Sequence, residues 1–129
     1  MAKITEDYVS FETAKLLKEK KFDAETDTYY SPEGKFKIWC PNGLKSYLDN
    51  NGTETWWWKC IAPTKSMAMK WLREVHDVYI NIIYNDTYVR PYEFRIIKQH
   101  SASKSDAYRY ITYEECVEKA IEFCLENLI

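Results

Sequence analysis

The strongest pattern in the sequence is an apolar repeat with helical spacing near the C-terminal end. Thr112 stands three residues before Glu115, and this capping box predicts that a helix starts there. The apolar positions that follow recur every three or four residues: Tyr113, Cys116, Val117, Ala120, Ile121, Cys124, Leu125 and Leu128. Five Glu residues are expected on the opposite side. So long an apolar face needs a covering layer, and we expect a sheet rather than a coiled-coil partner, because the helix is short.

Two further helices are expected before this one. The first begins after Ser10, a good N-cap residue, and ends near Lys20. The second opens at residues 63–64 and runs to about Val75 or His76. Runs rich in β-branched and aromatic residues predict strands at residues 26–30, 35–40, 44–48, 53–61, 78–84, 88–98 and 108–111. Because strands joined by short turns pair antiparallel, the sequence predicts an α+β fold: a two-layer sandwich of about three helices (N-terminal, central and C-terminal) on a mostly antiparallel sheet.

Several details of these elements can also be predicted. The apolar stripe of the second helix is expected to consist of Ala68, Trp71, Leu72 and Val75. His76 is suited to cap the end of that helix, where a cation is favoured. Pro91, inside the strand expected at 88–98, indicates an edge position or a bulge. Residues 100–107 are polar and rich in Ser, which indicates a mobile loop.

Length and composition fit one domain. The chain has 129 residues, of which 46% are hydrophobic, so residues 1–129 are expected to form a single α+β domain. The formal net charge of −2 argues against a general polyanion binder. Residues 88–110 carry five basic side chains against Glu93 and Asp106, whereas residues 112–129 carry five Glu against Lys119. Two differently charged solvated faces are the preferred interpretation, and an anion site on the basic stretch is the alternative.

The sequence indicates neither secretion nor membrane insertion. No apolar run follows Met1, and no stretch approaches the roughly 20 apolar residues of a membrane span, so we expect a cytoplasmic protein without a membrane partner. Neither the two histidines nor the cysteines have the close paired spacing of a zinc site; the cysteines are Cys40, Cys60, Cys116 and Cys124. We expect structural thiols, with no metal and no cofactor.

The aromatic residues supply a candidate binding surface. Trp56, Trp57 and Trp58 follow one another in the strand expected at 53–61, and side chains alternate between the two faces of a strand. The face opposite the helices is therefore expected to carry Trp39, Trp57 and Tyr79 with Lys37 and Lys59. Arg95, on the basic strand nearby, is suited to phosphate contacts. We nominate five ligand-binding residues: Trp39, Trp57, Lys59, Tyr79 and Arg95.

Three interpretations of this aromatic face are open. In the first, a loop or the segment 29–30 covers the indoles, which is at least as common as a functional surface. In the second, the face is self-complementary and joins copies of the chain into a homo-oligomer. In the third, it binds a flat, nucleotide-like small molecule, because indole faces beside Lys or Arg suit a base and its phosphate.

The sequence contains no recognisable catalytic motif. It has no nucleophile elbow, P-loop, dinucleotide-binding fingerprint or zinc-protease motif, and we nominate no catalytic residue. Nucleophilic catalysis by Cys or Ser needs a nearby base, and the two histidines are His76 and His100. A small hydrolase with a site near His100 or Cys40 stays open as an alternative, because active sites are assembled in three dimensions.

Three segments show a resemblance to known sequences: residues 10–23 (SFETAKLLKEKKFD), 62–77 (APTKSMAMKWLREVHD) and 112–129 (TYEECVEKAIEFCLENLI). They resemble stretches in a family of small proteins from gut Bacteroidales and their phages, over a little more than a third of the chain. In such relatives a Gly often stands at the position of Lys21, where a helix commonly ends. The family carries no assigned activity, so the resemblance transfers no functional residue. It implies a bacterial or phage cytoplasmic setting and an accessory role, such as host takeover or evasion of host defence.

Together these features predict a non-enzymatic accessory binding protein, encoded by a phage or a bacterium. Its expected role is counter-defence, by sequestering a ligand or a host protein. A single-stranded nucleic-acid or nucleotide binder that uses Trp39, Trp57, Lys59 and Arg95 is the first alternative. The small hydrolase is the second.

Overall fold

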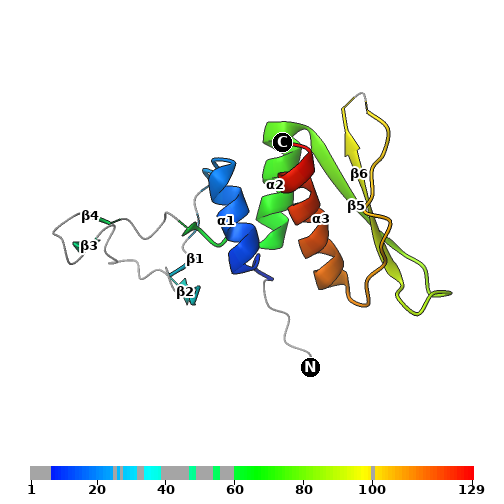
Figure 1. Ribbon diagram of the computed structural model, residues 1–129, viewed down its shortest axis with the longest axis horizontal. Helices are drawn as coiled ribbons and strands as arrows, with labels where there is room; N and C mark the ends of the chain where they lie inside the picture. The colour runs from blue at the N-terminus through cyan, green and yellow to red at the C-terminus, as the bar shows by residue number, and fades with distance from the viewer. Residues whose placement is uncertain are drawn as a thin grey trace.

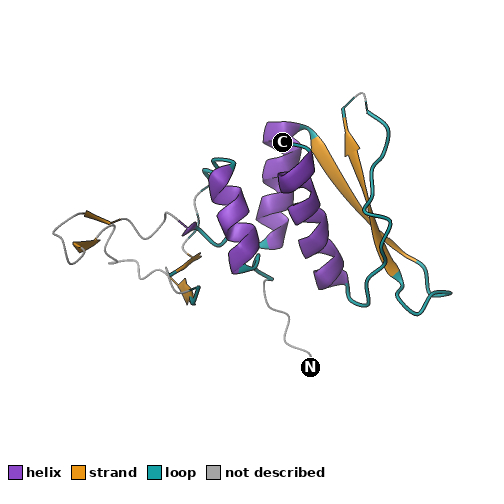
Figure 2. Cartoon of the chain, viewed as in Figure 1, coloured by secondary structure: helices purple, strands orange, loops and turns teal. Residues whose placement is uncertain are grey.

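A computed structural model describes residues 7–24, 26, 28–31, 34–38, 47–48, 54–55, 60–99 and 101–129. Within these residues it contains three helices: α1 (Phe11–Glu19), α2 (Lys65–His76) and α3 (Tyr113–Asn127). The strands form antiparallel pairs: β1 (Thr28–Tyr30) with β2 (Phe36–Ile38), β3 (Tyr47–Leu48) with β4 (Glu54–Thr55), and β5 (Val78–Tyr84) with β6 (Tyr92–Lys98). Figure 2 shows both kinds of element, and the predicted α+β class is confirmed. In the described part of the chain the strands form separate two-stranded sheets.

The helices lie together on one side of the long hairpin that β5 and β6 form. Figure 1 shows α3 between α1 and this hairpin, with α2 beside α3. The contacts agree, because α3 touches α1, α2 and both strands of the hairpin. One face of the hairpin is therefore covered by helices, and the other points away from them.

Strand alternation decides which hairpin residues face the helices. Phe94 and Ile96 of β6 are fully buried, and in the register they lie opposite Ile82 and Ile80 of β5. The residues that alternate with these along each strand point to the opposite face, which we call the outer face. They are Tyr79, Asn81, Ile83, Glu93, Arg95 and Ile97. Each strand thus turns apolar side chains toward the helices.

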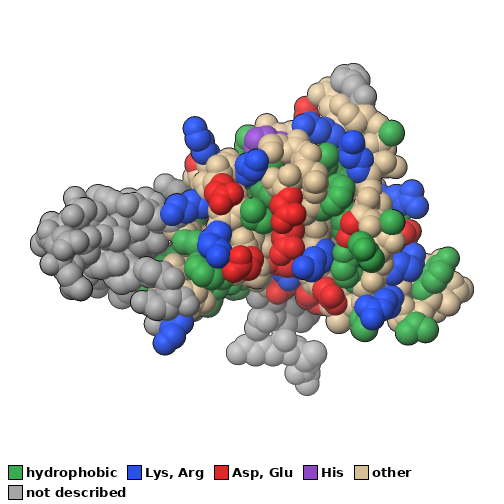
Figure 3. Space-filling view, in the orientation of Figure 1, with side chains coloured by type: hydrophobic (Ala, Val, Ile, Leu, Met, Phe, Trp, Pro, Cys, Tyr) green, Lys and Arg blue, Asp and Glu red, His purple; other side chains and the backbone are tan. Residues whose placement is uncertain are grey.

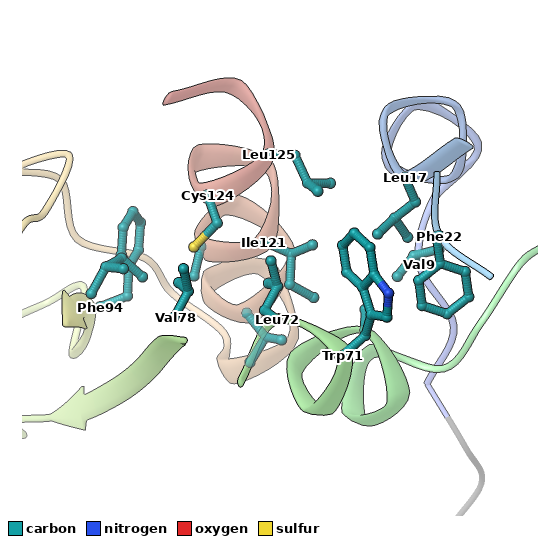
Figure 4. Close-up of a cluster of buried hydrophobic side chains, with 14 of the residues drawn as sticks. Val9, Leu17, Phe22, Trp71, Leu72, Val78, Phe94, Ile121, Cys124 and Leu125 are labelled. Atoms are coloured by element: carbon teal, nitrogen blue, oxygen red, sulfur yellow. The ribbon is translucent and has the colours of Figure 1, made fainter. Parts of the chain in front are cut away.

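The core lies on both sides of α3 (Figure 4). On one side Ile121 points toward Trp71 of α2, whose indole meets Phe22 edge-on with the ring centroids 5.2 Å apart. On the other side Cys124 points toward the hairpin, where Phe94 is buried. One helix with apolar residues on two sides therefore joins α1 and α2 to the hairpin.

The predicted caps Ser10 and Thr112 are confirmed, and Thr64 caps the helix that was expected to open at residues 63–64. The side chains of Ser10, Thr64 and Thr112 precede the three helices and each accepts a hydrogen bond from the backbone N–H three residues later. The distances are 3.2 Å for Ser10 Oγ, 3.1 Å for Thr64 Oγ1 and 3.1 Å for Thr112 Oγ1. Local side-chain chemistry is enough to fix where these helices begin.

Two predictions about apolar helix faces are wrong. Val75 is exposed, because His76 rather than Val75 continues the α2 contact in the last turn and packs edge-on against Trp71 with a centroid distance of 4.6 Å. Tyr113 is also exposed, because it is the first residue of α3 and meets Tyr92 at the end of the hairpin instead of the core. Both residues that were predicted to be buried but are exposed lie at a helix end.

The predicted hairpin around residues 31–34 is confirmed by the pairing of β1 with β2. Gly34 has a φ of 83°, and a Cβ atom there would come within 2.9 Å of the Phe11 ring, so the turn requires glycine. β2 and β4 cover only parts of the strands predicted at 35–40 and 53–61. Of the remaining positions, Lys35 and residues 60–61 are described outside these strands, and Ile61 forms an isolated bridge with Tyr29. The others, Trp39, Cys40, Thr53 and residues 56–59, lie outside the described residues.

Residues 101–110 run back along β6, on the edge that β5 does not occupy (Figure 1). Main-chain hydrogen bonds of 2.7 to 3.0 Å join Lys104 to Ile96 and Tyr110 to Tyr92. The sequence predicts a loop over most of this segment and a short strand at 108–111, and the structure has two isolated bridges instead. More residues separate Lys104 from Tyr110 than separate Tyr92 from Ile96, so the segment bulges between the bridges and regular pairing stops.

The strand predicted at 88–98 begins later, at Tyr92. Residues 85–91 form the hairpin loop, in which the Asn85 N–H donates to the Pro91 carbonyl at 2.9 Å. Pro91 therefore precedes the strand rather than lying at an edge position or a bulge within it. Proline has no backbone N–H to donate to a neighbouring strand, which suits the last residue of a loop.

Lys21 ends α1 in a left-handed conformation, with a φ of 65°. The Phe22 N–H donates to the Leu17 carbonyl and the Lys21 N–H to the Lys18 carbonyl, both at 3.0 Å, which is a Schellman motif. We expect Lys21→Gly to raise the free energy of unfolding in urea by about 0.5–1 kcal/mol, because a Cβ atom is disfavoured in this conformation. The control Lys21→Ala keeps the Cβ atom and should change the value by less than about 0.5 kcal/mol. A destabilised glycine variant would contradict this account.

Candidate functional site

Two of the five nominated ligand-binding residues lie together on the outer face of the hairpin. Tyr79 is opposite Ile97 and Arg95 is opposite Asn81, so Tyr79 and Arg95 are diagonal neighbours. Tyr79 is 45% exposed, and Arg95 is also exposed. The other three, Trp39, Trp57 and Lys59, lie outside the described residues. Their placement beside Tyr79 stays a prediction.

The basic side chains near Arg95 have an acidic partner. Glu93 Oε2 lies 3.3 Å from Arg109 Nη1, and Glu93 Oε1 lies 3.9 Å from Arg95 Nη2. Arg109 also donates from Nε to the Arg90 carbonyl and from Nη2 to the Pro91 carbonyl, each at 2.8 Å. The charge of Arg109 is therefore used to hold the hairpin loop in place, and it is balanced by Glu93 rather than presented to a phosphate.

Four tyrosines surround the loop end of the same hairpin. Tyr84 ends β5 and Tyr92 begins β6, and their ring centroids lie 5.1 Å apart. Tyr113 meets Tyr92 edge-on at 6.0 Å. Tyr88 lies in the loop, where the Arg109 guanidinium carbon is 3.9 Å from the centre of its ring. We call these four residues, Tyr84, Tyr88, Tyr92 and Tyr113, the tyrosine cluster.

The tyrosine cluster is open to solvent. Tyr84 is 60% exposed, Tyr88 and Tyr113 are exposed as well, and Val89 beside them in the loop is 95% exposed. Figure 3 shows apolar side chains next to Lys and Arg at this end of the hairpin, at the lower right. Exposed aromatic residues with an adjoining Arg are the composition expected of a protein contact surface.

Sequence reasoning missed this cluster. The helical repeat assigns Tyr113 to the buried face of its helix, and the run of Trp residues directs attention to another strand. A usable signal was present, because Tyr84, Tyr88 and Tyr92 recur every four residues across one turn sequence. Aromatic residues so close to a single turn cannot all reach the core of a domain, so some of them had to be exposed.

A second group of polar residues joins the start of α1 to α3. Glu118 Oε1 accepts hydrogen bonds from the Ser10 N–H at 2.9 Å and from Thr13 Oγ1 at 2.5 Å. Its other oxygen, Oε2, is 3.7 Å from Lys65 Nζ, which is an ion-pair distance too long for a hydrogen bond. Lys65 Nζ is closer to Asp7 Oδ2, at 2.9 Å. The carboxylate thus caps the N-terminus of α1 instead of standing as an open acid or base.

The described cysteines are not prepared for nucleophilic chemistry. Burial, above all, raises the pKa of Cys116 and of Cys124 to about 12, so both are protonated thiols at neutral pH. Burial also raises the pKa of Cys60. Their positions are those of structural thiols. Cys40 lies outside the described residues, so the hydrolase alternative stays a prediction there.

His76 lies at the predicted end of α2 but does not act as a cationic cap. Burial lowers its pKa, and the charges of Lys98 and Lys20 lower it further, so the surroundings favour the neutral ring over the cation. Both lysines are bound in turn, because Lys98 Nζ donates to the Leu128 carbonyl and Lys20 Nζ to the Ile129 carbonyl, each at 2.7 Å. The second histidine, His100, lies outside the described residues.

The described residues define a small α+β protein with an exposed cluster of aromatic side chains. Among them, no group of three or more His, Cys, Asp or Glu side chains is arranged to hold a metal ion. No described helix combines the length and the apolar composition needed to cross a membrane. Comparison of the chain with protein-family models, with curated proteins and with solved structures finds no match.

Proposed function

We propose that this chain is a non-enzymatic binding protein that holds a partner protein at the tyrosine cluster. The observation that carries the proposal is the joint exposure of Tyr84, Tyr88 and Tyr113 with Val89 at one end of the hairpin. Soluble proteins rarely leave several large apolar side chains together in solvent unless those side chains contact a partner. Tyr and Arg are also the residue types that most often contribute large shares of the binding energy at protein interfaces.

The chemistry of the cluster suits a polypeptide better than a polyanion. Each Tyr offers an apolar ring and a hydroxyl group that can donate or accept a hydrogen bond, which matches a protein surface. Phosphate recognition instead needs available positive charge. Here Arg109 is paired with Glu93, and Glu114 and Glu115 follow Tyr113 in the first turn of α3. These carboxylates would repel a nucleic-acid backbone.

The surface is already ordered without a partner. Tyr84 and Tyr92 belong to paired strands, and the hydrogen bonds from Arg109 fix the loop that carries Tyr88. A preformed surface loses less conformational entropy on binding than a disordered one. In the phage or bacterial cytoplasm that the resemblance implies, such a protein would serve as an accessory factor that sequesters a host protein.

Site-specific photocrosslinking tests the proposal. Benzoylphenylalanine at position 88, in a chain expressed in a Bacteroidales host, should form an adduct with a protein, whereas the same residue at position 75 should not. Val75 is the control because it is likewise exposed but lies on α2. With the purified partner, Tyr84→Ala and Tyr88→Ala should each raise the dissociation constant by about tenfold or more, and Val75→Ala should leave it unchanged.

Equal crosslinking at both positions would contradict the proposal, as would tyrosine variants that bind the partner as tightly as the parent. Circular dichroism establishes that each variant is folded. A labelled oligothymidine strand that binds at low salt and is released at high salt would favour the nucleic-acid alternative.

A further inference from the structure

We propose that two copies of this chain pair through the outer edges of their β5 strands, so that two hairpins join into one continuous antiparallel sheet. β6 has neighbours on both edges, namely β5 and the segment 104–110. Within the described residues, β5 has a strand neighbour on one edge only. A two-stranded sheet is marginal by itself, and a free strand edge is a template for another strand.

The hydrogen-bond pattern shows which main-chain groups of β5 face this free edge. Asn85 and Pro91 form a bonded pair, and bonded pairs alternate with non-bonded pairs along an antiparallel ladder. The bonded residues of β5 are therefore 79, 81 and 83. The N–H and C=O groups that point away from β6 belong to Val78, Ile80, Ile82 and Tyr84.

The other strand of the hairpin agrees with this assignment. Tyr92 and Ile96 of β6 lie opposite Tyr84 and Ile80, in pairs that are not bonded across the hairpin. Their N–H and C=O groups point to the other edge of β6, where they bond the segment 104–110. In the part of the chain that the structure describes, no main-chain hydrogen bond joins the outward groups of β5 to another segment. The outward groups of β5 are therefore available to a second strand.

If the two-fold axis between the two copies passes through Asn81, all of the outward N–H and C=O groups of β5 find partners. In that register Ile80 of one copy lies opposite Ile82 of the other, and Val78 lies opposite Tyr84. All of these residues point their N–H and C=O groups outward, so each pair can exchange two hydrogen bonds. A shift of the register in either direction leaves some of the outward groups without a partner.

The side chains are complementary in the same register. On the outer face Tyr79 lies opposite Ile83 of the second copy, and the isoleucines meet on the side that faces the helices, so the cross-strand pairs are apolar. β5 (VYINIIY) contains no charged residue and no proline, the features that usually prevent an exposed edge from pairing. Asn81 falls at the axis, where its amide can donate to and accept from the same amide of the second copy. Because the contact joins identical edges, it closes after two copies.

Asn81→Lys tests the proposal, because it places two ammonium groups opposite each other at the axis. Asn81 is exposed on the outer face, so the change leaves the core of each copy intact. The matched control is Asn127→Lys, the same substitution at an exposed position in the last turn of α3. By analytical ultracentrifugation the parent and the control should have the mass of two chains of 15.5 kDa each, and Asn81→Lys the mass of one. Asn81→Asp, which opposes two carboxylates, should behave like Asn81→Lys.

Amide hydrogen exchange supplies a readout that also shows whether the variant is folded. In the parent, the amides of Ile80 and Ile82 should be protected, and in Asn81→Lys they should exchange rapidly. The amides of Tyr79 and Ile83 should stay protected in both proteins, because they bond to β6. A parent of single-chain mass whose Ile80 and Ile82 amides exchange rapidly would overturn the proposal, and so would an Asn81→Lys variant that keeps the mass of two chains. The Tyr88→Ala variant keeps this contact, so loss of pairing and loss of partner binding are distinguishable.

Discussion

Replacing Phe94 with Ala is expected to lower the free energy of unfolding by about 3–5 kcal/mol. Phe94 is fully buried on β6. Its ring stacks on Tyr110 with a centroid distance of 6.3 Å and tilts against Phe123 of α3 at 5.6 Å. The side chain therefore joins the hairpin, the segment that follows it and the last helix. Truncation leaves a cavity that neighbours on these separate elements cannot fill together, so the loss exceeds the transfer free energy of the ring alone.

Urea denaturation monitored by circular dichroism measures this loss. The matched control is Tyr108→Ala, which truncates an aromatic side chain that is 69% exposed and should change the free energy of unfolding by less than about 0.5 kcal/mol. Domains of this size have only about 5–15 kcal/mol of stability, so the melting temperature of the Phe94 variant should fall by on the order of 10 °C. A Phe94→Ala variant as stable as the parent would show that the hairpin does not pack on α3.

Replacing Glu118 with Ala is expected to cost about 2–4 kcal/mol. The carboxylate is the common partner of the Ser10 N–H, the Thr13 hydroxyl group and the Lys65 ammonium group. Removing it leaves the Ser10 N–H without its charged acceptor and leaves the buried Thr13 hydroxyl to donate only over its longer contact, 3.2 Å, to Glu122 Oε1. It also removes a negative charge from the positive end of the α1 dipole. The cost falls on the contact between α1 and α3, because the two elements meet at this carboxylate.

Two further substitutions separate the contributions of charge and hydrogen bonding. Glu118→Gln keeps an acceptor oxygen but removes the charge, so its loss should lie between that of Glu118→Ala and that of the parent. Glu126→Ala removes an exposed carboxylate from the same helix and should stay within about 0.5 kcal/mol. Thermal and urea unfolding should rank the variants in that order. A Glu126 variant as unstable as Glu118→Ala would mean that net charge, and not the capping contact, decides the stability.

The parts of the fold that could be predicted are those that local sequence encodes. The helix starts are marked by Ser10, Thr64 and Thr112. They can be read from local sequence because a capping side chain bonds a backbone N–H only three residues later. The run of β-branched and aromatic residues at 78–84 matches the bounds of β5, since such residues favour a strand. Such signals extend over a few residues and can be read without knowledge of the rest of the molecule.

The parts that could not be predicted depend on contacts between distant residues. Glu118 is one of the five Glu residues assigned to the outside of its helix, yet it caps an amide 108 residues away. Tyr113 follows the apolar repeat but lies where the covering elements end, which the repeat cannot indicate. The tyrosine cluster likewise depends on where the hairpin stops relative to α3. The nominated indoles, Trp39 and Trp57, lie outside the described residues, so their part of the candidate site stays a prediction.

The position of α3 between α1 and the hairpin has a consequence for biosynthesis. A ribosome makes α1 long before it makes α3, and a nine-residue helix is too short to be stable by itself. Until the last helix emerges, the apolar sides of α1, α2 and β6 have no common neighbour and stay open to chaperones and proteases. The domain should therefore acquire its protection late and in one step, and a ribosome that stalls before α3 should release a chain destined for degradation.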